Sequence, residues 1–137
     1  MKLMQNLCFS GETLDALALY KRAFGCTEKS LLRYRDAVAN GWEPADESKA
    51  AQVYHSEILF GDQEVRMNDL SSPQDVALTR QVNHIVGFDT AQEVEHAFAV
   101  LSEGGEVIRP LEHPPYMVVI GKVRDRFGVQ WELMCDF

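Results

Sequence analysis

Two halves of the 137-residue chain carry the same order of predicted elements, and this repetition strongly limits how the chain can fold. Hydrophobic periodicity in the first half predicts a strand, a helix and three more strands, over residues 3–9, 12–24, 30–34, 53–60 and 64–69. The second half repeats this order, with strands over residues 83–89, 106–109, 117–123 and 129–135 and a helix after the first strand. Each half therefore has the form βαβββ. Because repeated units that cannot bury their sheets alone must pack together, we expect one domain of two modules, about 1–70 and 82–137.

Both predicted helices have an apolar stripe and end signals. The stripe of the first helix consists of Leu14, Leu17, Ala18 and Phe24, and Gly25 ends the helix. The second helix begins at Thr90–Glu93, which has the form of a capping box, and Gly104 stops it. Its stripe consists of Val94, Ala97, Phe98 and Leu101.

The last stretch of the chain predicts a hairpin whose second strand has two different faces. An Asp- and Gly-containing turn joins the strands. Strict alternation places Val129, Trp131, Leu133 and Cys135 on one side. The opposite side carries Gln130, Glu132 and Met134. We expect the first set to face the core and Glu132 to face a pocket.

Composition excludes several classes of partner. The formal net charge is −8 and no basic cluster stands out, so neither nucleic acid nor an anionic membrane is an expected partner. No apolar run reaches membrane-spanning length, and the first residues have no signal-peptide core. The three cysteines include no CxxC pair, which favours free thiols in a reducing cytoplasm. Dinucleotide, P-loop and nucleophile-elbow motifs are absent from the sequence.

The closing hairpin resembles that of the vicinal oxygen chelate (glyoxalase/bleomycin-resistance/dioxygenase) superfamily. The residues from Gly121 to Leu133 fit G-x-V-x-D-x-F-G-V-x-W-x-L, a form similar to the PhnB-like branch. The resemblance covers essentially the whole chain. It implies an α+β fold in which two βαβββ modules form a cupped mixed sheet with the helices on its outer face. It also implies a homodimer that binds a small organic molecule.

Metal enzymes of this superfamily place ligands on the first and last strands of each module. The resemblance maps these positions onto Gln5, Met67, His84 and Glu132. Met67 departs from the pattern, because glyoxalase I enzymes have a catalytic Glu there, and a shift to Arg66 or Asn68 restores no carboxylate. Glyoxalase I activity is therefore disfavoured. A divalent metal (Zn, Mn, Fe or Ni) held by Gln5, His84 and Glu132 stays open, as does a metal-free role in which His84 is a core histidine.

Other residues of interest lie in the first half. His55 is followed by a small residue and Glu57, as is common in PhnB-like proteins; it is a candidate acid–base or pocket residue, or a structural histidine. Glu132 is the other catalytic candidate. Arg35 and Arg66 could recognise an anion if they point inward. Trp42, within the predicted loop 36–52, is either a lid over a pocket or a packing or dimer contact.

Two functions follow as hypotheses. The first is a cytoplasmic small-molecule-binding protein with no obligatory metal, and its predicted pocket consists of Gln5, Trp42, His55, Met67, His84, Phe88, Glu132 and Met134. The alternative is a divalent-metal-dependent lyase or dioxygenase that uses Gln5, His84 and Glu132. Some PhnB-like proteins are labelled methyltransferases, but the chain has no glycine-rich strand-to-helix turn for a methyl-donor nucleotide.

Overall fold

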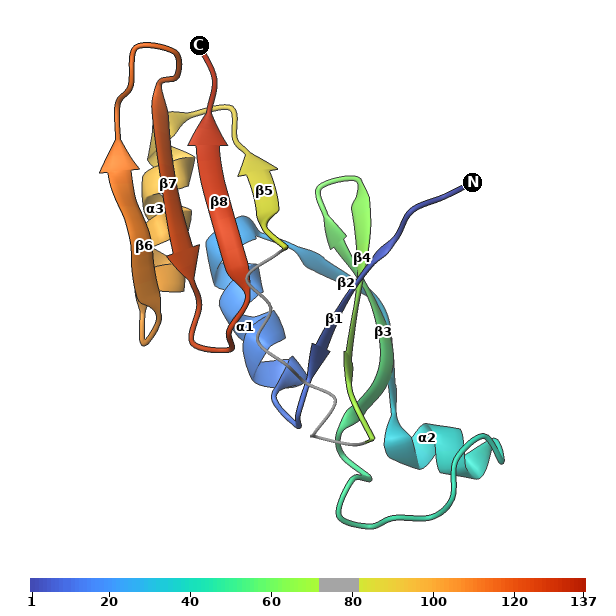
Figure 1. The fold of residues 1–137 in the computed structure, drawn as a ribbon. Helices are drawn as coiled ribbons and strands as arrows, with labels where there is room; N and C mark the ends of the chain where they lie inside the picture. Colours follow the sequence, from blue (N-terminus) through green and yellow to red (C-terminus); the bar gives the residue numbers. More distant parts are fainter. Residues whose placement is uncertain (72–81) are drawn as a thin grey trace. The chain divides into compact units, whose positions relative to one another are not determined.

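The computed structural model describes residues 1–71 and 82–137, and its contacts divide the chain into two units, Met1–Ala77 and Leu78–Phe137 (Figure 1). The first unit contains β1 (Gln5–Phe9), α1 (Thr13–Phe24), β2 (Thr27–Arg33), α2 (Tyr34–Ala39), β3 (Val53–Phe60) and β4 (Gln63–Asp69). The second contains β5 (His84–Gly87), α3 (Ala91–Ser102), β6 (Glu106–Glu112), β7 (Val119–Arg124) and β8 (Gln130–Cys135). Within these described ranges, no helix is long and apolar enough to cross a membrane.

Each unit forms a four-stranded mixed sheet with the same topology. The strand orders are β1-β4-β3-β2 and β5-β8-β7-β6, so equivalent strands occupy equivalent places. The first strand of each unit runs parallel to the last, and the other pairs are antiparallel. This topology confirms the predicted α+β fold of two βαβββ modules. It also leaves β1 and β5 as edge strands of their sheets.

A buried carboxylate, Asp69, organises the first unit. Its Oδ1 accepts hydrogen bonds from the Gly11 amide (2.9 Å) and from the amide (3.1 Å) and hydroxyl (2.8 Å) of Thr13. Its Oδ2 accepts one from the Val53 amide at 2.9 Å. The end of β4 is thereby tied to the starts of α1 and β3. Gly11 adopts a φ of +87°, which presents its amide to the carboxylate and which favours glycine.

This carboxylate explains why the predicted stripe of α1 is wrong. The hydrogen bond to Asp69 holds Thr13 in the core, and the orientation of Thr13 determines which face of the helix is buried. The buried positions are Thr13, Ala16, Leu17, Leu19, Tyr20 and Ala23. Leu14, a member of the predicted stripe, is 37% exposed, and Ala18 is also exposed. Gly25 ends the helix in the left-handed region, as predicted.

Two other elements differ from the sequence expectations. The predicted loop 36–52 begins inside a helix, α2, which the Asp36 carboxylate caps by accepting the Arg33 amide at 2.8 Å. Strand β6 extends to Glu112 and includes Pro110. Because β6 is an edge strand, proline removes no essential ladder hydrogen bond there.

The second unit packs α3 against β6, β7 and β8. The predicted capping box is present: the Thr90 amide donates to Glu93 Oε2 at 3.0 Å, and the Glu93 amide donates to Thr90 Oγ1 at 3.3 Å. On β8, Trp131 is 3% exposed, which confirms that it faces the core. A second buried carboxylate, Asp125, holds the hairpin turn and accepts the Trp131 indole N–H at 2.9 Å.

Trp131→Ala should reduce the free energy of unfolding by about 3–5 kcal/mol, because it removes a large buried aromatic side chain. Urea unfolding measures this loss. Trp42→Ala is the matched control, since Trp42 is 58% exposed and should cost much less. Equal losses for the two variants would contradict the packing described for β8.

Asp69→Ala should destabilise the protein by about 3 kcal/mol or more, because each buried N–H left without an acceptor costs roughly 1–3 kcal/mol. The exposed turn residue Asp62 provides the control variant, Asp62→Ala. The two free energies of unfolding are compared by urea titration. A loss for Asp69→Ala no larger than that of Asp62→Ala would show that Asp69 does not hold the first unit together.

Candidate functional site

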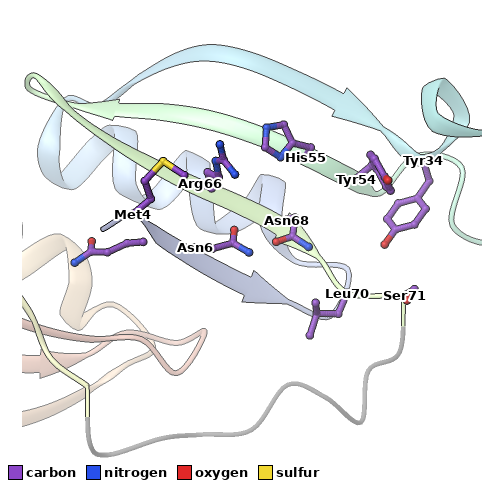
Figure 2. Close-up of a pocket in the computed structure, with 10 residues that line it drawn as sticks. Met4, Asn6, Tyr34, Tyr54, His55, Arg66, Asn68, Leu70 and Ser71 are labelled. Carbon is purple, nitrogen blue, oxygen red and sulfur yellow. The ribbon is translucent and has the colours of Figure 1, made fainter. Parts of the chain in front are cut away.

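The first unit contains a cavity of about 460 Å³ on one face of its sheet (Figure 2). Its lining residues come from the start of the chain, from β1, β3 and β4, and from the segments beside them. They are Met4, Gln5, Asn6, Tyr34, Tyr54, His55, Arg66, Asn68, Leu70 and Ser71. Gln5 and His55 belong to the pocket predicted from the sequence.

Strand register decides which side chains reach this cavity. Asn6 of β1 pairs with Arg66 of β4, and Arg66 pairs with Glu57 of β3. Because side chains alternate along a strand, Arg66 and Asn68 face the cavity, and Met67 points to the other side. Met67 is 0% exposed and does not line the cavity.

The structure therefore corrects the position predicted for Met67. The alternation of β4 is offset by one residue from the expected one, so a guanidinium and an amide stand where the thioether was expected. Neither group is a carboxylate. Glu64 shares this face of β4 but does not line the cavity, so β4 supplies no carboxylate base to the cavity lining.

Arg66 is the chemically distinctive residue of the cavity. Its Nε is buried and has no hydrogen-bond partner among the described residues. The facing carboxylate, Glu57, is directed toward β2 instead: it accepts the Ser30 hydroxyl at 3.3 Å and lies 3.5 Å from Lys29 Nζ. A buried N–H without an acceptor is unusual in a native structure and calls for an explanation.

Aromatic rings form the other part of the lining. Tyr34 and Tyr54 are in edge-to-face contact, with ring centroids 5.3 Å apart. The Tyr34 hydroxyl donates to the Asp69 carbonyl at 2.8 Å, and burial raises the pKa of Tyr34. Trp42 stacks on Tyr54 at 6.4 Å but does not itself line the cavity. This contact with Tyr54 fits both roles predicted for Trp42, that of a lid residue and that of a packing contact.

His55 lies in the lining beside a carboxylate. Its Nε2 is 3.7 Å from Glu57 Oε1, so the two groups form an ion pair when the imidazole is protonated. Glu57 in turn belongs to a charged cluster with Lys29 and Glu64, whose side chains are 2.7 Å apart. Lys29 is shared by the two carboxylates, and the Arg66 charge, after the larger effect of Lys29, also lowers the pKa of Glu64.

The second unit places His84 and Glu132 on opposite faces of its sheet. In the parallel pairing of β5 and β8, His84 lies opposite Trp131, and Ile85 lies opposite Glu132. The His84 and Trp131 rings are 5.1 Å apart, whereas Ile85 is 63% exposed. The expectation that His84 and Glu132 face one site is thereby corrected: His84 is on the core side, because the alternation of β5 is offset by one residue.

The other predicted positions lie in different units. Phe88 and Met134 are half-buried in the second unit, where the Phe88 amide donates to the Met134 carbonyl at 2.9 Å. Gln5 belongs to the first unit and pairs with Val65. In the described ranges there is no group of three or more His, Cys, Asp or Glu side chains arranged to hold a metal ion. Arg35 is exposed on α2 and does not line the cavity.

All three cysteines are free thiols. Cys26 and Cys135 are buried, and burial raises the pKa of the Cys26 thiol to about 11. Burial also raises the pKa of Cys8, which contacts Asn68 Oδ1 at 3.7 Å. Because the thiolate is the nucleophilic form, these environments do not support a catalytic cysteine.

Several solved structures are similar to the chain over its whole length. A PhnB protein from Bacillus cereus shares 24% identity with a TM-score of 0.82, covering 98% of this chain and 99% of that chain. A protein from Pseudomonas aeruginosa shares 24% identity with a TM-score of 0.81, covering 99% and 98%. The fosfomycin resistance protein FosX from Mesorhizobium loti shares 11% identity with a TM-score of 0.62, covering 98% and 90%. No curated protein matches the chain.

The family model that matches residues 1–134, together with the repeated βαβββ topology and the shared fold, identifies a PhnB-like member of the vicinal oxygen chelate superfamily. More narrowly, the chain belongs to the family described as 3-demethylubiquinone-9 3-methyltransferase, which matches residues 1–134. The resemblance seen in the closing hairpin is thus confirmed.

The environment of His84 predicts a pH dependence of stability. Burial lowers its pKa, and the nearby Asp125 carboxylate only partly opposes this effect. The unfolded chain therefore binds a proton more readily than the folded one, and stability falls as pH drops below about 6.5, the ordinary imidazole value. His84→Gln should flatten the decrease in the free energy of unfolding between about pH 7.5 and 5.5.

Urea unfolding across this range measures the effect. An unchanged pH dependence in His84→Gln would refute the core position of this imidazole.

Proposed function

We propose that the protein binds a small organic molecule in the cavity of its first unit and that binding needs no metal ion. The observation that carries this proposal is the buried, unpartnered Arg66 Nε in the cavity lining. A volume of about 460 Å³ falls within the range of small-molecule sites. The lining combines aromatic rings with a few polar groups, the usual composition of such sites.

The amides of the lining supply directional recognition. Gln5, Asn6 and Asn68 bring side-chain amides, which carry both donors and acceptors, to the lining. His55 adds a ring nitrogen that donates or accepts according to its tautomer. These groups suit a ligand that carries its own polar atoms rather than a purely apolar one.

No observation favours the alternative of a metal-dependent lyase or dioxygenase. That function would use Gln5, His84 and Glu132, but strand pairing puts His84 and Glu132 on opposite sheet faces. The methyltransferase activity in the family description also lacks support. The amides at the turn between β1 and α1, where a Gly-rich loop would hold a nucleotide, are occupied by Asp69.

The same proposal includes a cytoplasmic homodimer. All three cysteines are free, which fits a reducing compartment. Exposed apolar side chains lie on the edge strands of the second sheet, where Ile85 of β5 and Val107 of β6 are accessible. A second copy of the chain would remove such surface from water.

A fragment screen on EDTA-treated protein tests the binding function. Ligands found by thermal shift and ligand-observed NMR should bind wild type without added metal. Asn68→Trp, which fills the cavity from β4, should weaken them at least about tenfold, equivalent to about 1.4 kcal/mol. The control Gln63→Trp adds the same side chain at an exposed position on the same strand and should leave binding unchanged.

The absence of any ligand that Asn68→Trp weakens would refute the proposed cavity. Binding that appears only after a divalent ion is added would refute its metal-free character.

A further inference from the structure

The charge of the cavity is opposite to that of the protein. The chain carries a formal net charge of −8, yet none of the described lining residues is Asp or Glu. Arg66 is the one permanent cation among those residues. Two carboxylates lie outside the lining: Glu57 pairs with Arg66 across the strands, and the Arg66 charge lowers the pKa of Glu64 after the larger effect of Lys29. Inside the lining, the guanidinium stands beside neutral amides and provides a site for a group with one negative charge.

The strand neighbours of Arg66 do not use its buried donor. Glu57 faces Arg66 across β3 and β4, but its carboxylate is held by Ser30 and lies near Lys29 and His55. The neighbour on the other side is Asn6, a neutral amide. Folding has therefore left Arg66 Nε without an acceptor, and a bound anion would supply one. Arginine suits this role because its planar fork matches the two oxygens of a carboxylate.

The aromatic rings of the cavity lining lie apart from the Arg66 guanidinium. Figure 2 shows Tyr34 and Tyr54 toward one end of the cavity and Arg66 toward the other, with His55 and Asn68 between them. Tyr54 is held between the edge contact of Tyr34 and the stacked ring of Trp42. A ring fixed in this way offers a rigid surface on which a flat aromatic group can pack.

We infer that the ligand of this cavity is a small aromatic carboxylate. Its carboxylate oxygens accept hydrogen bonds from the Arg66 guanidinium. The amides of Asn6 and Asn68 each use one N–H, on Cys8 Sγ and on the Asp69 carbonyl, and the second N–H of each can add a donor. Its ring lies toward Tyr54. This inference deepens the proposed small-molecule function and rests on it, because it names the ligand class of the same cavity.

The test uses three matched probes and the full chain. The probes are 2-naphthoate, its neutral isostere 2-naphthamide, and the saturated acid decahydro-2-naphthoate. Isothermal titration calorimetry gives the affinities, and the NMR signal of the Arg66 Nε–H, identified by its loss in Arg66→Gln, reports contact with the carboxylate. Wild type should prefer 2-naphthoate over both other probes by about tenfold or more, the effect expected for a hydrogen bond to a charged group.

Variants separate the role of the charge from that of the fold. Arg66→Gln should abolish the preference for acid over amide, and Arg66→Lys should retain part of it. Arg22→Gln is the control, because it removes the same charge from an exposed position on α1, outside the cavity lining, and should retain the full preference. If Arg66→Gln fails to fold, the wild-type probe series and the Arg66 Nε–H signal still decide the result.

The outcomes distinguish the inference from the function on which it rests. Equal binding of acid and amide, or an acid preference that survives in Arg66→Gln, overturns anion recognition but leaves a binding cavity. Equal binding of the aromatic and saturated acids overturns the aromatic part. If no probe binds and the fragment screen also yields no cavity ligand, both the inference and the proposed function fail.

Discussion

Each unit of this protein contains a buried carboxylate that accepts several hydrogen bonds, and the positions of the surrounding elements depend on these bonds. Asp69 accepts four hydrogen bonds from the starts of α1 and β3, and it stands at the end of β4. Asp125 accepts the amides of Phe127 and Val129 and the indole of Trp131. Carboxylates are rarely buried unless such donors surround them, because desolvation of the charge is costly. In the first unit, this arrangement fixes the strand on which Arg66 stands.

Sequence periodicity predicted the architecture for two reasons. The same order of strands and helix occurs in both halves of the chain, and apolar and polar residues alternate along the closing strand. Trp131 and Leu133 on β8 are apolar, and the intervening Glu132 is not, so the core face could be identified. The stripe of α1 was misplaced because Thr13, a polar residue, is buried by its bonds to Asp69. A long-range hydrogen bond of this kind leaves no periodic signal in the sequence.

The candidate site was harder to predict because its strands are short or ambiguous. β5 has four residues, and His84 and Ile85 could each face either side. A shift of one residue moves every side chain to the opposite face, so pairing with β8 was needed to place His84 beside Trp131. On β4, the sequence Val65, Arg66, Met67 does alternate, with the arginine between two apolar residues. That pattern could have identified Arg66 as the cavity residue without the structure.

The sign of charge on β4 connects the fold to the proposed chemistry. Glyoxalase I enzymes of the superfamily carry on this strand a carboxylate that attracts a metal cation and serves as a base. Here Arg66 is the charged residue that β4 contributes to the cavity lining, and its guanidinium stays protonated at any physiological pH. A fixed positive charge repels a divalent cation and attracts an anion, and the effect is strong where water is partly excluded. One fold can thus provide a cation site or an anion site through a single strand position, and the anion site inferred for the first unit of this chain is the second case.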